Sequence, residues 1–153
     1  MAIAEFVPPD PDYAARVAAS FARQSAMETI GARLAEVAPG RVVIELPFAP
    51  ALTQQHGFLH AGVVGMALDS ACGYAAFSLM PVEAAVLTIE YKINLLAPAH
   101  GQRFRMEGHV VKPGRTITVA EGRAYATDDG AGKLIATMTC TLMAVTGRAG
   151  IRQ

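Results

Sequence analysis

The segment from Ala61 to Met80, AGVVGMALDSACGYAAFSLM, contains one charged side chain, Asp69, among apolar and small residues. A segment of this length that is apolar on every side either spans a membrane or forms a helix that is buried all round. The polar side chains of Asp69, Ser70 and Ser78, and the lack of Lys or Arg at either end, favour a buried helix. A buried, unpaired carboxylate would cost several kcal/mol. We therefore expect Asp69 to have polar partners or a chemical task.

Composition and net charge limit the class of protein. The chain has 153 residues, of which 52% are apolar and 17% charged, which is typical of a single globular domain over residues 1–153. A formal net charge of zero argues against a nucleic-acid partner, because such proteins normally carry a basic surface. The N-terminus has no basic segment followed by a long apolar one, so we expect no secretory signal, no membrane partner and a cytoplasmic location.

The side chains that most often bind metals are scattered along the chain. Cys72 and Cys140 have apolar neighbours and no metal-ligand spacing, so we expect them to be small core residues in a reducing compartment. His56, His100 and His109 show no such spacing either, and we expect them on the surface or in loops. The sequence therefore predicts no metal site.

Periodicity predicts one helix, two strands, the long helix and four further strands. The first helix is expected at about residues 11–25, after Pro and Asp cap signals, and the core at about residues 30–146. Extended runs on both sides of Pro39 and Gly40 indicate a hairpin. After Pro81, short turns between successive strand-like runs predict antiparallel neighbours. These runs are AAVLTIEYKINLLAPA, QRFRMEGHVVK, TITVAEGRAYAT and KLIATMTCTLMAV.

The last of these runs alternates between two predicted faces. One face carries Leu134, Ala136, Met138, Cys140, Leu142 and Ala144, and the other carries Ile135, Thr137, Thr139, Thr141 and Met143. One long helix is able to cover the apolar face of such a sheet. A helix that is apolar all round is covered better if the helix of a second subunit lies beside it. We therefore expect an α+β protein that forms at least a dimer.

The region around the long helix resembles a known family. The segments QQHGFLHAGVVGMALDSACGYAA, LTIEYKINLLAPA and KPGRT are similar to the PaaI-like hotdog-fold thioesterases over about residues 30–145. The spacing that carries the resemblance is that of Gln54, Gly57, His60, Gly62 and Asp69.

Two positions depart from the usual pattern of the family. Gln54 stands where Asn is common, and keeps an amide donor on a longer side chain. Ala61 stands where Gly is common, and keeps its backbone N–H. The resemblance implies a hotdog fold, in which a curved antiparallel sheet wraps a long central helix. It also implies hydrolysis of an acyl or aryl-acyl thioester of coenzyme A, with no cofactor besides the coenzyme A of the substrate.

Thioester hydrolysis requires a base or nucleophile, and donors for the oxyanion that develops. The start of a helix offers free backbone N–H groups for this purpose. The resemblance implies that the Ala61 N–H and the Gln54 amide polarise the carbonyl. It further implies that Asp69 is the general base or nucleophile, and that Thr88 positions the carboxylate or the water.

Five more residues are candidates for substrate binding. His60 precedes the long helix and is expected to hold the loop by hydrogen bonds, with Gly57 in a turn and Gly62 at the helix start. Lys112 and Arg115 flank a Pro-Gly turn and are candidates to bind coenzyme A phosphates, although exposed hairpin charges are usually only solvated.

Helix geometry predicts a site shared between two subunits. Ala61 and Asp69 are eight residues apart, which corresponds to about 12 Å along a helix. A thioester carbon must lie about 3–3.5 Å from its attacker while its oxygen meets the donors. One chain therefore cannot supply both groups, and we expect a homodimer with antiparallel helices, assembled further into a dimer of dimers as is common in the family.

Two alternatives to hydrolysis remain at this stage. A hotdog hydratase or dehydratase would pair the carboxylate with a His, and positions 63–80 contain none. A non-catalytic acyl-CoA-binding module would be favoured by loss of the carboxylate, and Asp69 is present.

Overall fold

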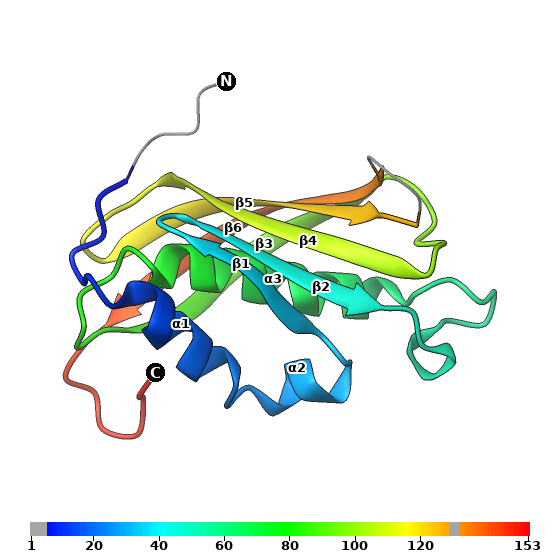
Figure 1. Ribbon diagram of the computed structural model, residues 1–153. Helices are drawn as coiled ribbons and strands as arrows, with labels where there is room; N and C mark the ends of the chain where they lie inside the picture. Colours follow the sequence, from blue (N-terminus) through cyan, green and yellow to red (C-terminus); the bar gives the residue numbers. More distant parts are fainter. Residues whose placement is uncertain (1–5, 129–131) are drawn as a thin grey trace.

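The computed structural model describes residues 6–128 and 132–153 (Figure 1). Its helices are α1 (Tyr13–Phe21), α2 (Ser25–Thr29) and α3 (Ala61–Phe77), with a short 3-10 helix at Pro50–Leu52. Its strands are β1 (Arg33–Ala38), β2 (Arg41–Pro47), β3 (Ala85–Leu95), β4 (Arg103–Lys112), β5 (Ile117–Ala126) and β6 (Lys133–Val145). The predicted α+β architecture is confirmed, because a curved antiparallel sheet lies around the long helix α3.

The strand order contradicts the expectation that all successive strands are neighbours. The order is β1-β2-β4-β5-β6-β3, so that β3 pairs with β6 at one edge and β4 pairs with β2 and β5. The segment 96–102 between β3 and β4 is longer than most hairpin turns, which have about 2–5 residues. It carries the chain across the end of the sheet, and one edge of β3 has no partner within residues 6–128 and 132–153.

Both predicted helices are shorter in the structure. The helix predicted at residues 11–25 is α1, which ends at Phe21, because Gln24 adopts an extended conformation. A separate short helix, α2, begins at Ser25 and places Met27 in the core. The long helix ends at Phe77. Met80 lies in a tighter turn beyond it, in which the Met80 N–H donates a hydrogen bond to the Phe77 carbonyl at 3.0 Å. Among the described residues, no helix is both long enough and apolar enough to cross a membrane.

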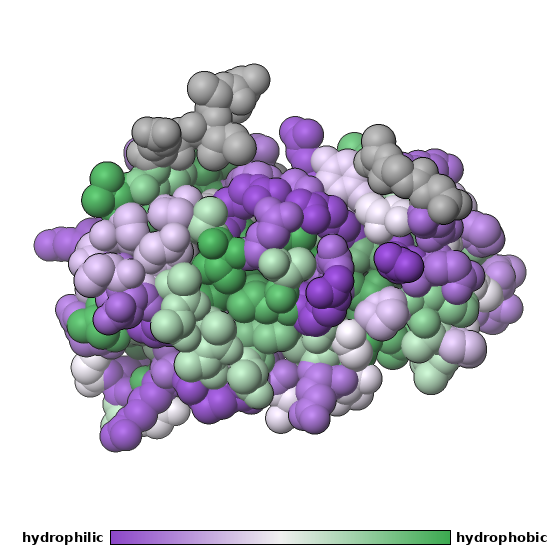
Figure 2. Space-filling view, in the orientation of Figure 1, coloured by the Kyte–Doolittle hydropathy of each residue, from purple (hydrophilic) through white to green (hydrophobic). Residues whose placement is uncertain are grey.

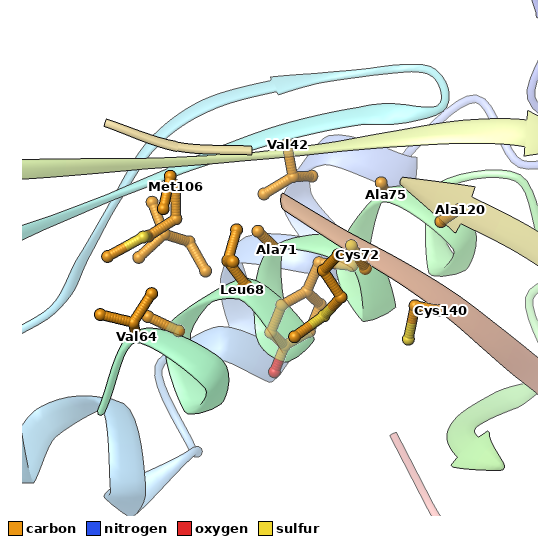
Figure 3. Packing of buried hydrophobic residues seen from close by; sticks show 14 of the residues in the cluster. Val42, Val64, Leu68, Ala71, Cys72, Ala75, Met106, Ala120 and Cys140 are labelled. Carbon is orange, nitrogen blue, oxygen red and sulfur yellow. The ribbon is translucent and has the colours of Figure 1, made fainter. Parts of the chain in front are cut away.

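Close contact between α3 and the inner face of the sheet depends on small residues. A Cβ at Gly108 of β4 would lie 2.3 Å from the carbonyl oxygen of Ala71, so only glycine fits at this position. Figure 3 shows this part of the core, in which α3 packs against several strands. The buried residues labelled there are Val42, Val64, Leu68, Ala71, Cys72, Ala75, Met106, Ala120 and Cys140.

The start of β6 departs from the predicted alternation. A register shift at Ala124 and Tyr125 of β5 leaves Ile135 without a cross-strand partner, as in a β-bulge. Ile135 is therefore only 1% exposed, although it was predicted on the same face as the threonines. The extra residue also shifts the alternation before it, so that Leu134, which pairs with Tyr125, lies on the opposite face from Ala136 and not on the same face as predicted. Period-2 patterning of β6 alone does not reveal this bulge, because the bulge depends on the register with β5.

Arg16 of α1 closes the C-terminal end of α3. Its guanidinium donates hydrogen bonds to the carbonyl oxygens of Phe77 (3.1 Å), Met80 (2.7 Å) and Pro81 (2.7 Å). Its Nε lies 3.2 Å from the Asp10 carboxylate, and the group stacks 4.4 Å from the centroid of the Phe77 ring. A cation here also opposes the negative end of the helix dipole.

Replacement of Arg16 by Met is expected to lower the free energy of unfolding by about 2–4 kcal/mol, because Asp10 and the carbonyl groups lose their partner. Urea denaturation measures this change. Arg23→Met is the matched control, since the exposed guanidinium of Arg23, just after α1, bonds only the Ala19 carbonyl among the described residues, at 3.0 Å. An equal decrease in the free energy of unfolding in Arg16→Met and Arg23→Met would contradict the role of Arg16.

Ion pairs connect β1, β2 and β4 on the outer face of the sheet. Glu36 pairs with Arg41 and, at 2.9 Å, with Arg105, which also bonds Glu107 at 2.7 Å. A hydrophilic band over these strands is visible in Figure 2. Hydrogen bonds from Arg41 and Arg105 lower the pKa of Glu36. Burial opposes ionisation of Glu107, but Arg105 and His109 outweigh it and lower the pKa of that carboxyl as well.

These shifts predict a loss of stability in acid. In the unfolded chain, Glu side chains have pKa values near about 4.3, so they bind protons at pH values at which Glu36 and Glu107 of the folded state are still ionised. The two ionised carboxylates therefore contribute to the free energy of unfolding above about pH 4.3. This contribution is lost as the pH falls through their lower folded pKa values. Glu36→Gln is expected to cost at most about 1 kcal/mol at pH 7, because the side chain is largely exposed. Urea denaturation should show this difference shrinking below about pH 4. A difference in the free energy of unfolding between wild type and Glu36→Gln that stays constant down to pH 3 would contradict the prediction.

Candidate active site

The start of α3 presents an unused backbone donor. His60 is the N-cap residue, and its Nδ1 accepts a hydrogen bond from the Gly62 N–H at 2.8 Å. The His60 carbonyl accepts from Val63 at 2.9 Å. The Ala61 N–H has no acceptor within residues 6–128 and 132–153, as expected for the first turn of a helix. His60 therefore holds the helix start in place while the Ala61 N–H stays available.

Gln54 adds a second donor from the preceding loop. Its side-chain Oε1 accepts from the backbone N–H of His56, and its carbonyl accepts from Gly57 at 3.0 Å. Gly57 has a positive φ of 83°, which suits a turn made with glycine. Since Oε1 is occupied, the Gln54 NH₂ group remains free to donate; it has no acceptor in the part of the chain that the structure describes.

Gln54 and Ala61 line an apolar cavity of about 480 Å³, which we call the donor cavity. Its other walls come from the loop before α3, the end of β3, the segment that follows β3, and the bulge in β6. The remaining lining residues are Phe58, Leu59, Val64, Leu95, Leu96, Ala97, Pro98, Ala99 and Ile135.

Asp69 is half-buried and has polar partners. Thr88 of β3 donates its hydroxyl to Asp69 Oδ1 at 2.7 Å, and the Cys140 thiol of β6 donates to the same oxygen at 3.8 Å. These contacts explain how an apolar helix accommodates a carboxylate. Asp69 faces a second cavity of about 270 Å³, the carboxylate cavity. It is lined by Gln24, Asp69, Ser70, Gly73, Tyr74, Val86, Leu87, Thr88 and Gln153.

No described residue lines both cavities. The structure therefore brings Gln54 together with Ala61, and Asp69 together with Thr88, but it separates the two pairs along α3. Lys112, at the end of β4, and Arg115, in the turn that follows, are exposed and line neither cavity.

Residues of the carboxylate cavity escaped the sequence prediction. Gln24 accepts a hydrogen bond from Ser70 at 3.2 Å, and Gln153 bonds both Ser20 and the N–H of Val86. These partners are distant in the sequence, so no local spacing signals them.

The edge strand β3 exposes large apolar side chains next to this cavity. Its outer edge has no partner strand among the described residues. Met66 of α3, one turn from Asp69, is also 38% exposed. The exposed apolar side chains of β3 are those of Leu87, Ile89, Tyr91 and Leu95.

Comparison with known proteins places this geometry in context. Residues 56–133 match the family model of the thioesterase superfamily. The crystal structure of a thioesterase family protein from Silicibacter pomeroyi is similar with a TM-score of 0.86 and 62% identity, covering 88% of this chain and 99% of that chain. The Escherichia coli PaaI protein, from the phenylacetic acid degradation operon, has a TM-score of 0.80 over 89% of this chain and 95% of its own. At 16% identity, PaaI shows likeness of fold alone.

Curated relatives match over a shorter region. A Saccharolobus solfataricus protein named "Putative esterase" is 38% identical over 82 residues, which is 54% of this chain and 58% of the relative. The chain spans about three-fifths of the length of the curated relatives that it matches.

Proposed function

Because the chain belongs to the thioesterase superfamily, we propose that it hydrolyses an acyl or aryl-acyl thioester of coenzyme A to the free acid and coenzyme A. The observation that carries this proposal is the presence of two complementary half-sites on α3. One offers the free donors of Ala61 and Gln54, and the other offers the anchored carboxylate of Asp69. These are the groups that thioester hydrolysis requires.

In the proposed reaction, the Ala61 N–H and the Gln54 NH₂ group bind the carbonyl oxygen of the thioester. Asp69 either takes a proton from a water molecule that attacks the carbonyl carbon, or attacks that carbon itself to form an anhydride that water then hydrolyses. The C–S bond breaks, the sulfur takes a proton, and coenzyme A leaves. The reaction is proposed to use no metal or other resident cofactor.

Two subunits are proposed to complete each active site. The unpaired edge of β3 is suited to antiparallel pairing with the same edge of a second copy, which would cover its exposed apolar side chains. Such pairing would place two α3 helices side by side, with the donor cavity of one chain against the carboxylate cavity of the other. A homodimer of this kind, assembled into a dimer of dimers in the cytoplasm, is our proposed state.

The remaining predicted residues receive supporting roles in this proposal. His60, Gly57 and Gly62 shape the donor side of the active site. Lys112 and Arg115 bind phosphates of coenzyme A at the entrance, where exposed cations meet an exposed polyanion.

The proposal is tested by measuring release of free thiol from a panel of straight-chain, benzoyl and phenylacetyl thioesters of coenzyme A. Wild-type protein is expected to release thiol from at least one class of substrate. Hydration and dehydration would instead change the acyl group without releasing thiol. Binding of acyl-CoA without turnover of any thioester in the panel would overturn the proposal and favour a binding module.

A further inference from the structure

The two protein donors to Asp69 bind the same carboxylate oxygen. Thr88 comes from β3 and Cys140 from β6, and both donate to Oδ1, at 2.7 and 3.8 Å. Oδ2 has no donor among the described residues. A carboxylate held in this way has one anchored oxygen and one oxygen that is available to water or substrate.

Cys140 is part of a buried pair of thiols. Cys72 of α3 and Cys140 of β6 are both fully buried, and Figure 3 shows them where the helix meets the strand. A hydrogen bond with Cys140, together with burial, raises the pKa of the Cys72 thiol. Buried thiols that stay protonated are poor nucleophiles. Cys72 is therefore suited to donating a hydrogen bond rather than to attacking a substrate.

The direction of the hydrogen bonds follows from the carboxylate. Ionised Asp69 has acceptors only, so the Cys140 proton must point toward Oδ1. The Cys140 sulfur is then free to accept from Cys72. A hydrogen bond to a charged acceptor is stronger than one from the same donor to a neutral acceptor. This compensates in part for the weakness of a thiol as a donor.

We infer that Cys140 is a positioning residue for Asp69, and that with Thr88 it anchors Oδ1 so that Oδ2 faces the reacting thioester. This inference rests on the proposed function. Cys140 does not touch the substrate, and it acts by limiting rotation of the carboxylate about its χ2 angle. Its loss should therefore lower kcat and leave KM nearly unchanged, because the cavities that bind the substrate are retained.

The experiment compares four single variants with the wild-type enzyme, using the acyl-CoA that releases thiol fastest. Cys140→Ala removes the donor, and Cys140→Val removes it while keeping a side chain of similar size. Each is expected to lower kcat about 3–10-fold, the effect of one modest hydrogen bond. Cys140→Ser keeps a donor and should retain at least half of the wild-type kcat. Cys72→Ala removes the neighbouring buried sulfur, which makes no hydrogen bond to the Asp69 carboxylate among the described residues, and should change kcat less than 2-fold. KM should change less than 2-fold in all four variants.

The same measurements separate positioning from packing. If Cys140→Ala does not fold, the comparison of Cys140→Ser with Cys140→Val tests the inference instead, and the Ser variant is expected to have the higher kcat. Equal kcat values in these two variants would overturn the inference, as would an equal loss in Cys72→Ala. The inference also requires that Cys140→Ala has no further effect in an Asp69→Asn background. Asp69→Asn alone distinguishes the two proposals, since full activity in that variant would refute the proposed function itself.

Discussion

Asp69→Asn is expected to lower kcat/KM by about 10²–10⁴-fold, because it removes the group that acts as base or nucleophile. Asparagine has nearly the same shape as aspartate, so the packing of α3 should be retained. Its Oδ1 is still able to accept the hydrogen bond from Thr88, which is 2.7 Å long in the structure. Steady-state release of thiol from acyl-CoA measures the loss, and equilibrium binding of acyl-CoA should be nearly unchanged.

The matched control for this variant is Asp12→Asn. Asp12 is an exposed carboxylate before α1 whose side chain makes no capping hydrogen bond. It should keep full activity. Retention of more than about a tenth of kcat/KM by folded Asp69→Asn would contradict the assignment of Asp69.

Ala61→Pro is expected to lower kcat by about 10²–10³-fold, the usual effect of losing one donor to an oxyanion. Proline lacks the backbone N–H, yet it is well tolerated at the first position of a helix. The preceding residue, His60, already has the extended conformation that proline requires, with φ of −62° and ψ of 137°. The substitution therefore removes one hydrogen-bond donor without disrupting α3.

Ala61→Gly serves as the control for this prediction, because it keeps the N–H and should remain within a few-fold of wild type. Circular dichroism and urea denaturation check that both variants fold. Unimpaired hydrolysis by folded Ala61→Pro would show that the Ala61 N–H does not bind the carbonyl oxygen.

Mixing the two inactive variants tests whether the site is shared. If each site combines Asp69 of one chain with Ala61 of the other, a hybrid of Asp69→Asn and Ala61→Pro has one intact site and one site that lacks both groups. Random pairing makes half of the dimers hybrids, so roughly a quarter of wild-type activity should return. Two affinity tags verify that hybrids form. Hybrids without activity above the parental average would place both groups of each site in the same chain.

Local patterns determined much of this fold. The turn at Pro39 and Gly40, the alternation of β4 to β6 and the apolar run of α3 each follow from interactions between residues close in the sequence. The spacing from Gln54 to Asp69 also predicted which loop and helix carry the two proposed half-sites, because these segments are continuous in the chain.

Tertiary contacts decided what local patterns could not. The position of β3 beside β6 depends on the path of segment 96–102 around the sheet. The bulge that buries Ile135 depends on the register between two strands. A turn signal or an alternating pattern contains no information on the position of β3 or on the bulge. Both features depend on which of several possible strand pairings, between residues far apart in the sequence, is the most stable.

The environment of Asp69 shows the same division. The sequence alone indicated that this carboxylate needs polar partners, since its neighbours on the helix are apolar. Only the folded chain shows that Thr88 and Cys140 provide them, from strands that are adjacent in the sheet but far apart in the sequence. The need for a partner follows from the energy of a buried charge, whereas the choice of partner follows from which side chains the packed sheet brings within hydrogen-bonding distance.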